Sequence, residues 1–170
     1  MAEERAYKDL WEHIEELDKA DLLYRIDKPV NKDTEMHPLV RWQFRGGIAE
    51  AERKAFLFTN VVDSKGRQYD IPVLIGGLAA NPEIYRIGMA ADTLDDIGPL
   101  WERGLNQPVS TNVVAEAPCQ EIVMTGSEVQ GAGNGLDALP IPISTPGYDT
   151  GPYFTAATWI TKDIDSSVQN

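Results

Sequence analysis

The residues best suited to chemistry lie near the C-terminal end of the sequence, where a polar run leads into a candidate strand. Residues 149–155 read DTGPYFT, residues 160–163 read ITKD, and Asn170 comes shortly after them. An amide that follows a strand and a polar turn can direct one oxygen at a hard cation, or at a metal ion bound to a phosphate. Asn170 is therefore a candidate metal ligand, and an ordinary polar turn is the alternative.

The glycine-rich stretch GAGNG at residues 131–135 is a second candidate, because backbone N–H groups in such loops can bind phosphate. A dinucleotide-binding loop, however, has the spacing G-x-G-x-x-G and lies between a strand and a helix. The residues after this stretch do not have the pattern of an amphipathic helix. We therefore interpret it as a surface loop.

The two histidines and the single cysteine do not form a recognisable site. His13 falls among the polar positions of a helix and is expected to be solvated, while His37 lies beside Pro38 near a helix start. Neither has the neighbouring carboxylates or thiols that a metal site requires. Cys119 has no histidine close in sequence to act as its base, so we expect a buried, unreactive thiol. Glu121 could act as a general base, but an isolated carboxylate in an acidic chain is usually a surface group, and we assign it no role.

The charge of the chain excludes several classes of partner. It has 27 acidic and 15 basic residues, which gives a formal net charge of −12. Such a surface repels phosphate backbones and anionic lipids, so we expect no nucleic-acid and no membrane partner. No apolar run reaches the roughly 20 residues of a membrane helix, and the first residues lack the features of a secretory signal. With a single cysteine, these features predict a cytoplasmic protein.

Helical and strand patterns alternate along the first part of the chain. Residues 5–19 carry apolar side chains at helical spacing and predict an amphipathic helix. Residues 22–26 predict a strand. A second helix is expected to begin at Asp33 or Thr34, either of which can cap it. Pro38 fits that helix only in its first turn.

Two β-rich runs, AFLFTNVV at 55–62 and IPVLI at 71–75, are separated by a turn composition and predict an antiparallel pair. Helices are expected at 82–90 and at 93–105, the second of them capped by Thr93. Helices and strands that mix in this way indicate a compact α/β (α+β) fold. After Pro108, the strands expected are residues 109–115, 121–125 and 153–161.

Several separated motifs, in this order, resemble those of the UbiD family of decarboxylases. DLLYRI at 21–26, which follows the first helix, is similar to the family's usual opening, and FLFTNV at 56–61 resembles its LLFENV strand. APCQE at 117–121 is similar to a stretch of the branch that acts on hydroxyaryl and heteroaryl carboxylates. The signature run is resembled by LPIP at 139–142, then DTGPYFT at 149–155, ITKD at 160–163 and Asn170.

The resemblance covers essentially the whole chain, with one local departure. The family often has a proline after the Lys-Asp pair and a glycine in the following turn, whereas this chain has Ile164 and then Ser166 and Ser167. The departure concerns the geometry of that turn more than the family.

The resemblance implies a longer enzyme than this chain. Residues 1–115 would form an N-terminal α/β domain, and residues 116–170 the first strands of a split β-barrel that binds prenylated FMN. It also implies a divalent metal ion, commonly manganese (Mn²⁺), and potassium (K⁺) at the flavin phosphate. By position, Asn170 matches the metal-binding asparagine of the family, and Thr155 lies near a strand position that approaches the cofactor. The family's later His, Glu and Arg residues have no counterpart on this sequence, so no catalytic residue is assigned.

The expected activity is that of a lyase, the non-oxidative and reversible decarboxylation of an aromatic or heteroaromatic carboxylic acid, and the chain alone is expected to be inactive. The alternative is a non-catalytic subunit or assembly module of a split decarboxylase complex. A truncated piece of a complete enzyme is a third interpretation. In each case we expect the remainder of the enzyme or a partner chain to complete the site, and we expect a homo-oligomer.

Overall fold

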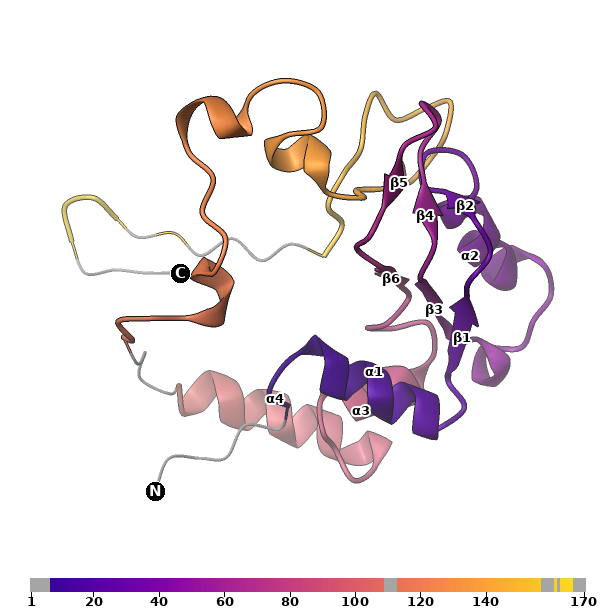
Figure 1. The fold of residues 1–170 in the computed structure, drawn as a ribbon. Coiled ribbons are helices and arrows are strands. Elements are labelled where there is room, and N and C mark those ends of the chain that lie inside the picture. Colours follow the sequence, from indigo (N-terminus) through magenta and orange to yellow (C-terminus); the bar gives the residue numbers. More distant parts are fainter. Residues whose placement is uncertain (1–6, 109–112, 157–160, 162, 167–170) are drawn as a thin grey trace.

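A computed structural model describes residues 7–108, 113–156, 161 and 163–166. Helices and short strands alternate in the first two thirds of the chain, and 3-10 turns joined by irregular segments make up the rest (Figure 1). The α-helices are α1 (Leu10–Lys19), α2 (Met36–Arg45), α3 (Pro82–Gly88) and α4 (Ile97–Asn106). The strands are β1 (Leu23–Ile26), β2 (Val30–Asn31), β3 (Ala55–Phe58), β4 (Val61–Val62), β5 (Gln68–Tyr69) and β6 (Val73–Ile75). The 3-10 helices are η1 (Glu50–Glu52), η2 (Leu94–Asp96), η3 (Pro118–Gln120), η4 (Gly126–Val129) and η5 (Gly135–Ala138).

The strands form two three-stranded sheets. In the first, the order is β1-β3-β6, with β1 parallel and β6 antiparallel to the central β3. In the second, the order is β2-β4-β5, with β2 parallel and β5 antiparallel to β4. The predicted antiparallel pairing of runs 55–62 and 71–75 is confirmed by β3 and β6. The run 55–62, however, is divided between the two sheets at residues 59–60.

The core lies on both faces of β3, because neighbouring side chains of a strand point to opposite sides. Ala55 and Leu57 join a cluster with residues of α1 and α3, while Phe56 and Phe58 join a second cluster with residues of α2. All four side chains of β3 are buried. Helices therefore cover both faces of the first sheet, and the predicted mixed α/β fold is confirmed (Figure 1).

The helix starts follow from local hydrogen bonds. Asp9 caps α1, because its Oδ1 accepts from the backbone N–H groups of Trp11 at 2.8 Å and Glu12 at 3.2 Å. Thr93 forms the expected cap in η2, where its hydroxyl and backbone N–H both donate to Asp96. Pro38 lies in the first turn of α2, as predicted.

The predicted cap of α2 is wrong. The helix begins at Met36, and Asp33 is engaged elsewhere: it accepts hydrogen bonds from the Lys32 ammonium at 2.6 Å and from the backbone N–H of Ser64 at 3.0 Å. Asp33 therefore joins the start of α2 to the loop after β4 instead of capping the helix.

Asn81, the N-cap of α3, is expected to make a measurable contribution to stability. Its Oδ1 accepts from the Ile84 N–H at 3.0 Å, and its amide donates to the backbone carbonyl of Arg53. Asn81→Ala loses both bonds, and we expect the free energy of unfolding to fall by about 2 kcal/mol. Asn81→Asp keeps the acceptor for the helix and should lose less. Urea unfolding of the two variants would contradict the cap if they were equally destabilised.

The segment after α4 departs from the sequence prediction. Residues 121–125, expected as a strand, are irregular, and Ile122 and Val123 are exposed. A β-rich run forms a strand only where a neighbouring strand accepts its backbone hydrogen bonds, and within the described residues none lies beside this one. Residues 113–115 and 153–156 are also irregular, whereas residues 109–112 and 157–160 lie outside the described part. The domain boundary at 115/116 stays a prediction.

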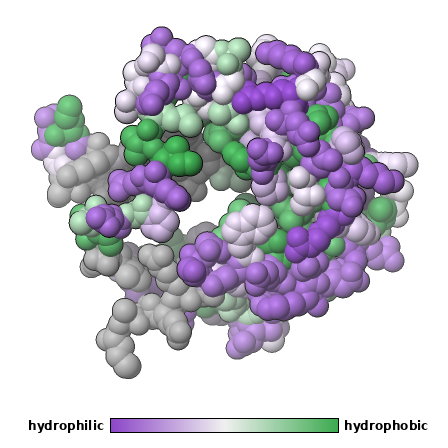
Figure 2. All heavy atoms as spheres, in the orientation of Figure 1, coloured by the Kyte–Doolittle hydropathy of each residue, from purple (hydrophilic) through white to green (hydrophobic). Residues whose placement is uncertain are grey.

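The hydropathy of the surface is uneven. Hydrophilic side chains dominate the face formed by α1 and the sheets, and hydrophobic side chains border the opening towards the C-terminal segment (Figure 2). No helix in the described ranges has both the length and the hydrophobicity needed to cross a bilayer.

Candidate functional site

The candidate site is the stretch of residues 139–155, called here the motif segment, which carries the LPIP and DTGPYFT runs. It starts by packing on the α/β layers: Pro140 and Ile141 are buried, and the Ile143 N–H donates to the carbonyl of Lys32 at 3.2 Å. Further on, the Tyr153 N–H donates to the carbonyl of Pro142 at 3.1 Å. The two ends of the segment are thus held beside each other.

A tight turn closes the loop between these two ends. The backbone N–H groups of Tyr148 and Asp149 donate to the carbonyl of Thr145 at 3.1 and 3.0 Å. In return, the Thr145 N–H donates to Asp149 Oδ2 at 2.6 Å. Gly147 has a φ of +85°, a conformation that costs a glycine little and other residues more. Asp149, which opens the DTGPYFT run, therefore fixes the shape of the turn that precedes it.

Arg41 of α2 attaches this turn to the helical layer. Its Nη2 donates to the carbonyl of Ser144 at 2.8 Å and to Oγ1 of Thr145 at 3.2 Å. One turn earlier on the same helix, His37 is half-buried. Burial lowers the pKa of His37 below its ordinary value, and the positive charge of Arg41 lowers it further, while Asp149 opposes the shift. His37 is therefore neutral in the folded protein near pH 7.

The lowered pKa of His37 gives a pH dependence of stability with a defined sign. The folded protein binds a proton at His37 less readily than the unfolded chain does, so this residue's contribution is present above the ordinary histidine pKa of about 6.5 and is lost as the pH falls below it. We expect His37→Gln to lose less stability than the wild type between pH 7.5 and pH 5. Urea unfolding at the two pH values measures the difference, and parallel losses in both proteins would contradict it.

The ion pair of Lys32 and Asp33 lies where the motif segment begins to pack on the α/β layers. Lys32 is buried, its ammonium lies 2.6 Å from Asp33 Oδ1, and it lies 5.8 Å from the centre of the Tyr69 ring. Burial raises the pKa of Asp33, but hydrogen bonds from Lys32 and Ser64 outweigh this effect and hold the pKa below its ordinary value. Asp33 is thus charged at neutral pH, and the pair fixes the backbone whose carbonyl receives Ile143.

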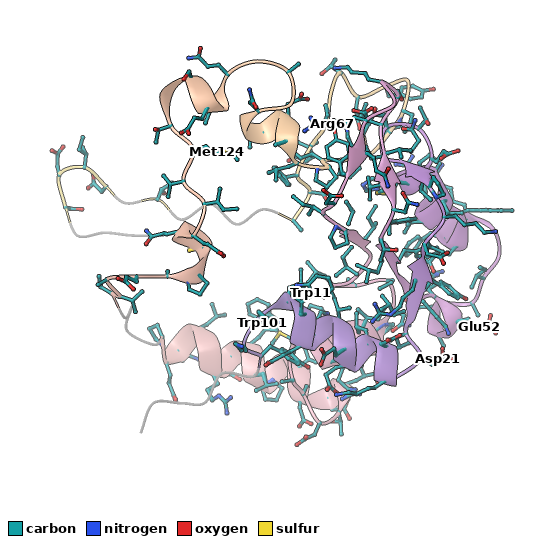
Figure 3. The ribbon with its side chains drawn as sticks, viewed as in Figure 1. Trp11, Asp21, Glu52, Arg67, Trp101 and Met124 are labelled. Atoms are coloured by element: carbon teal, nitrogen blue, oxygen red, sulfur yellow. The ribbon has the colours of Figure 1, made fainter. Side chains whose placement is uncertain are left out.

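Arg67 holds the glycine-rich stretch that precedes the motif segment (Figure 3). Its guanidinium donates to the carbonyl of Asp137 at 2.7 Å and to that of Gly133 at 3.2 Å, and it lies 4.8 Å from the Tyr69 ring. Gly133 has a φ of +86°, and an added Cβ would lie 3.4 Å from Arg67 Nη1. The stretch is followed by the 3-10 helix η5 rather than by an α-helix, which agrees with its interpretation as a loop.

The predicted site residues are only partly described. Thr155 follows the motif turn in an exposed bend, so its hydroxyl is accessible to a ligand such as a phosphate oxygen. Asn170 lies outside the described residues, and its role as a metal ligand stays a prediction. Within the described ranges, no group of three or more His, Cys, Asp or Glu residues could hold a metal ion. The exposed Thr155 hydroxyl can thus donate to a phosphate group, but the described residues do not provide a whole cofactor site.

Two expectations about single residues are wrong. His13 is 5% exposed instead of solvated: its Nε2 lies 2.7 Å from the carbonyl of Gly77, and Gly88 of α3 passes so close that an added Cβ would lie 3.5 Å from its ring. The helical pattern alone gave no sign that the polar side of α1 would be covered by α3. Cys119, expected to be buried, is exposed in the short 3-10 helix η3. Glu121, which was assigned no role, is also exposed.

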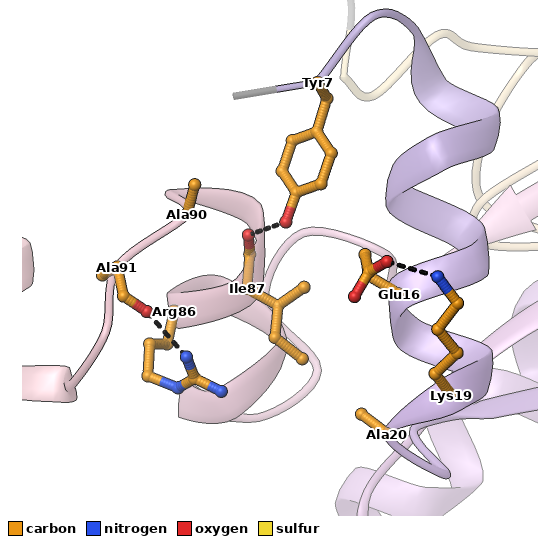
Figure 4. A pocket seen from close by; sticks show the side chains of 8 residues that line it. All are labelled: Tyr7, Glu16, Lys19, Ala20, Arg86, Ile87, Ala90 and Ala91. Carbon is orange, nitrogen blue, oxygen red and sulfur yellow. Dashed lines mark hydrogen bonds and ion pairs between the residues drawn. The ribbon is translucent and has the colours of Figure 1, made fainter. Parts of the chain in front are cut away.

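A cavity of about 360 Å³ lies between α1 and α3 and is distinct from the motif segment (Figure 4). Its polar groups are already paired: Lys19 with Glu16 at 2.6 Å, Arg86 with the carbonyl of Ala91 at 2.6 Å, and the Tyr7 hydroxyl with the carbonyl of Ile87. A second cavity beside it is lined by Glu83, Arg86 and residues 92–95. Because the polar groups of the first cavity already bind one another, few of them are available to bind a ligand.

The roles of Arg41 and Arg67 were not predicted from the sequence. Neither arginine belongs to a motif, and their partners lie 103 and 70 residues further along the chain. The two arginines are identified only in the folded protein, where each guanidinium donates to at least one backbone carbonyl of a distant loop.

Comparison with known proteins gives a consistent picture. No protein-family model matches the chain. The UbiD-class enzyme HmfF from Pelotomaculum thermopropionicum in complex with FMN is 29% identical, with a TM-score of 0.72 over 95% of this chain and 32% of that one. An evolved dimeric form of HmfF in complex with prFMN is 27% identical, with a TM-score of 0.76 over 96% of this chain and 34% of that one.

Vanillic acid decarboxylase from Sedimentibacter hydroxybenzoicus, in an open form, shares the fold, with 24% identity and a TM-score of 0.74 over 95% of this chain and 33% of that one. The chain thus spans about a third of the length of the proteins that it matches. These likenesses confirm the resemblance to the UbiD family that the ordered motifs indicated.

Proposed function

We propose that this chain, which has the fold of part of a UbiD-class enzyme, forms the N-terminal third of a flavin-dependent decarboxylase of aromatic or heteroaromatic carboxylic acids. The observation that carries the proposal is the match over 95% or more of the chain to HmfF in complexes with FMN and prFMN. The order of the LPIP, DTGPYFT and ITKD runs supports the same assignment.

The chemistry explains why such an enzyme needs a cofactor. Loss of carbon dioxide from an aryl carboxylate leaves a carbanion in the plane of the ring, where ring resonance does not stabilise it. A prenylated flavin, when bound, supplies the electron sink for this charge. The protein's part is to bind and orient the acid, exclude water and deliver a proton.

This chain would contribute scaffold and cofactor contacts to that site. The exposed hydroxyl of Thr155 would contact the flavin, and the amide oxygen of Asn170 would hold Mn²⁺, with K⁺ also at the phosphate. Carboxylate, amide and water oxygens are the ligands that such hard cations prefer. The groups that handle substrate and proton would come from the rest of the enzyme, so we propose that the chain alone is inactive and that the complete enzyme is a homo-oligomer.

The test is to combine the chain with the remainder of the enzyme, add prenylated FMN and Mn²⁺, and measure carbon dioxide release or H/D exchange on a panel of aryl and heteroaryl acids. Parallel reactions with unmodified FMN and without metal serve as controls. We expect turnover only with the complete set. No turnover and no exchange with any acid of the panel would count against the proposal.

A second candidate function is that of a non-catalytic subunit or assembly module in a split decarboxylase complex. Large apolar side chains on two helices favour a role in binding other polypeptides: Trp42 of α2 is 70% exposed, and Leu105 of α4 is 76% exposed. Native mass spectrometry separates the two functions. A separate partner that carries the missing His, Glu and Arg residues indicates a split enzyme, whereas self-association without flavin indicates an assembly module.

A further inference from the structure

We propose that Arg41 and Arg67 are positioning residues, a two-arginine clamp that fixes the motif segment and the glycine-rich stretch before it on the α/β layers, and so sets where Thr155 meets the cofactor. The inference rests on the proposed function, because it concerns the same site. It adds two residues that lie outside every motif of the sequence and that act through the backbone of the segment.

The contacts of the clamp are spread along the chain before Thr155. Arg67 holds the carbonyls of Gly133 and Asp137, and Arg41 holds the carbonyl of Ser144 and the hydroxyl of Thr145. Between the two arginines, the carbonyl of Lys32 receives the Ile143 N–H. Residues 133–145, which lead into and begin the motif segment, are therefore fixed at three successive points: by Arg67 of the β4–β5 loop, by Lys32 directly after β2, and by Arg41 of α2.

A backbone hydrogen bond near the end of the motif segment links the position of Thr155 to that of the clamped residues. The Tyr153 N–H donates to the carbonyl of Pro142, directly beside the anchored Ile143 and Ser144. Thr155 is thus only two residues from a backbone bond to the clamped stretch. A shift of Ser144 away from α2 would move the whole turn, and the threonine with it.

The chemistry of the clamp favours positioning over general stability. Three of its four acceptors are main-chain carbonyls, so the arginines fix the path of the backbone whatever side chains it carries. A guanidinium presents several N–H groups in a rigid plane and reaches two acceptors at once, which an ammonium does less well. Arg67 is itself held against Tyr69, whose hydroxyl donates to Asp63 at 3.1 Å.

The test measures segment mobility and flavin binding separately. Arg41→Met and Arg67→Met remove the clamp bonds, and the matched controls are Arg45→Met, an exposed arginine on the same helix, and Lys65→Met, an exposed residue two positions before Arg67. Hydrogen exchange in peptides covering residues 131–155 reports mobility. Titration of the complete enzyme with FMN, followed by flavin fluorescence, reports affinity.

We expect exchange in these peptides to rise roughly 10-fold in the clamp variants, with the controls unchanged. The dissociation constant for FMN should rise by about 10-fold, although the urea midpoint of the core moves no more than in the controls. Arg41→Lys, which can still reach one acceptor, should bind FMN with an affinity between those of Arg41→Met and the wild type. This variant also tests the clamp if Arg41→Met folds poorly.

Three results would overturn the clamp or its premise, and they are distinguishable. Unchanged exchange in both variants means that the arginines do not hold the segment. Faster exchange with wild-type FMN affinity means that they hold it without positioning the cofactor. A wild-type enzyme that binds no FMN defeats the proposed function itself, and the positioning role with it.

Discussion

A complete enzyme that carries Asn170→Ala is expected to lose about 100-fold or more of its kcat/KM and to retain much less manganese after dialysis. The physical reason is that an amide oxygen lost from the shell of a hard cation is replaced by mobile water, which weakens both the affinity of the site and its geometry. The prediction follows from the position of Asn170 after the ITKD run. Steady-state kinetics and metal analysis of the purified protein measure the two effects.

The neighbouring amide provides the control for this experiment. Gln169→Ala removes a similar side chain one position earlier and should leave metal content and kcat/KM near the wild-type values. If Asn170→Ala keeps its manganese and its activity, Asn170 is not a ligand. The assignment to the UbiD family, which rests on the whole fold and on other motifs, would survive that result.

Phe58→Ala is expected to lower the free energy of unfolding by about 3 to 5 kcal/mol. Phe58 ends the central strand β3, is 0% exposed, and stacks on Phe56 with ring centroids 6.0 Å apart. Its removal would leave a cavity between the sheet and α2. Because the free energy of unfolding of a whole domain is only about 5 to 15 kcal/mol, this single change would remove a large part of the stability.

Urea unfolding followed by far-UV circular dichroism measures the loss. Ile71→Ala is the matched control, since Ile71 lies before β6, is 46% exposed, and should cost less than about 1 kcal/mol. A loss at Phe58 no larger than at Ile71 would contradict the view that β3 is the centre of the core. It would also contradict the view that packing against Phe58 holds α2, and with it Arg41, in place.

Local features of this protein were predictable where neighbouring residues decide them. The apolar spacing within residues 5–19 and the side chain of Thr93 act within a turn or two of the backbone. A helix in the first region, observed as α1, and a cap at Thr93 were therefore predicted. The β-rich composition of 55–62 and 71–75 likewise predicted an antiparallel pair, which β3 and β6 form. The predicted start of α2 was wrong because Asp33 does not cap the helix. It accepts a hydrogen bond from the backbone N–H of Ser64, a residue distant in sequence.

The same distinction applies to the candidate site. The runs at 139–142 and 149–155 carried the resemblance to the UbiD family, and the comparisons confirm it. The sequence could not predict that 121–125 would lack a partner strand, because β-propensity is expressed only where another strand pairs with it. Nor could it predict that α3 would cover His13, since only the packing of two helices decides that burial.

The sequence by itself determined the acidic charge, the helical and strand patterns and the ordered motifs that resemble those of the UbiD family. The tertiary structure alone decided the parallel pairing of β1 with β3 and the attachment of the motif segment by Arg41 and Arg67. The reason is that such contacts join residues far apart in the chain, where the loop-closure entropy must be offset by the packing of the whole fold. No local pattern of side chains carries that information.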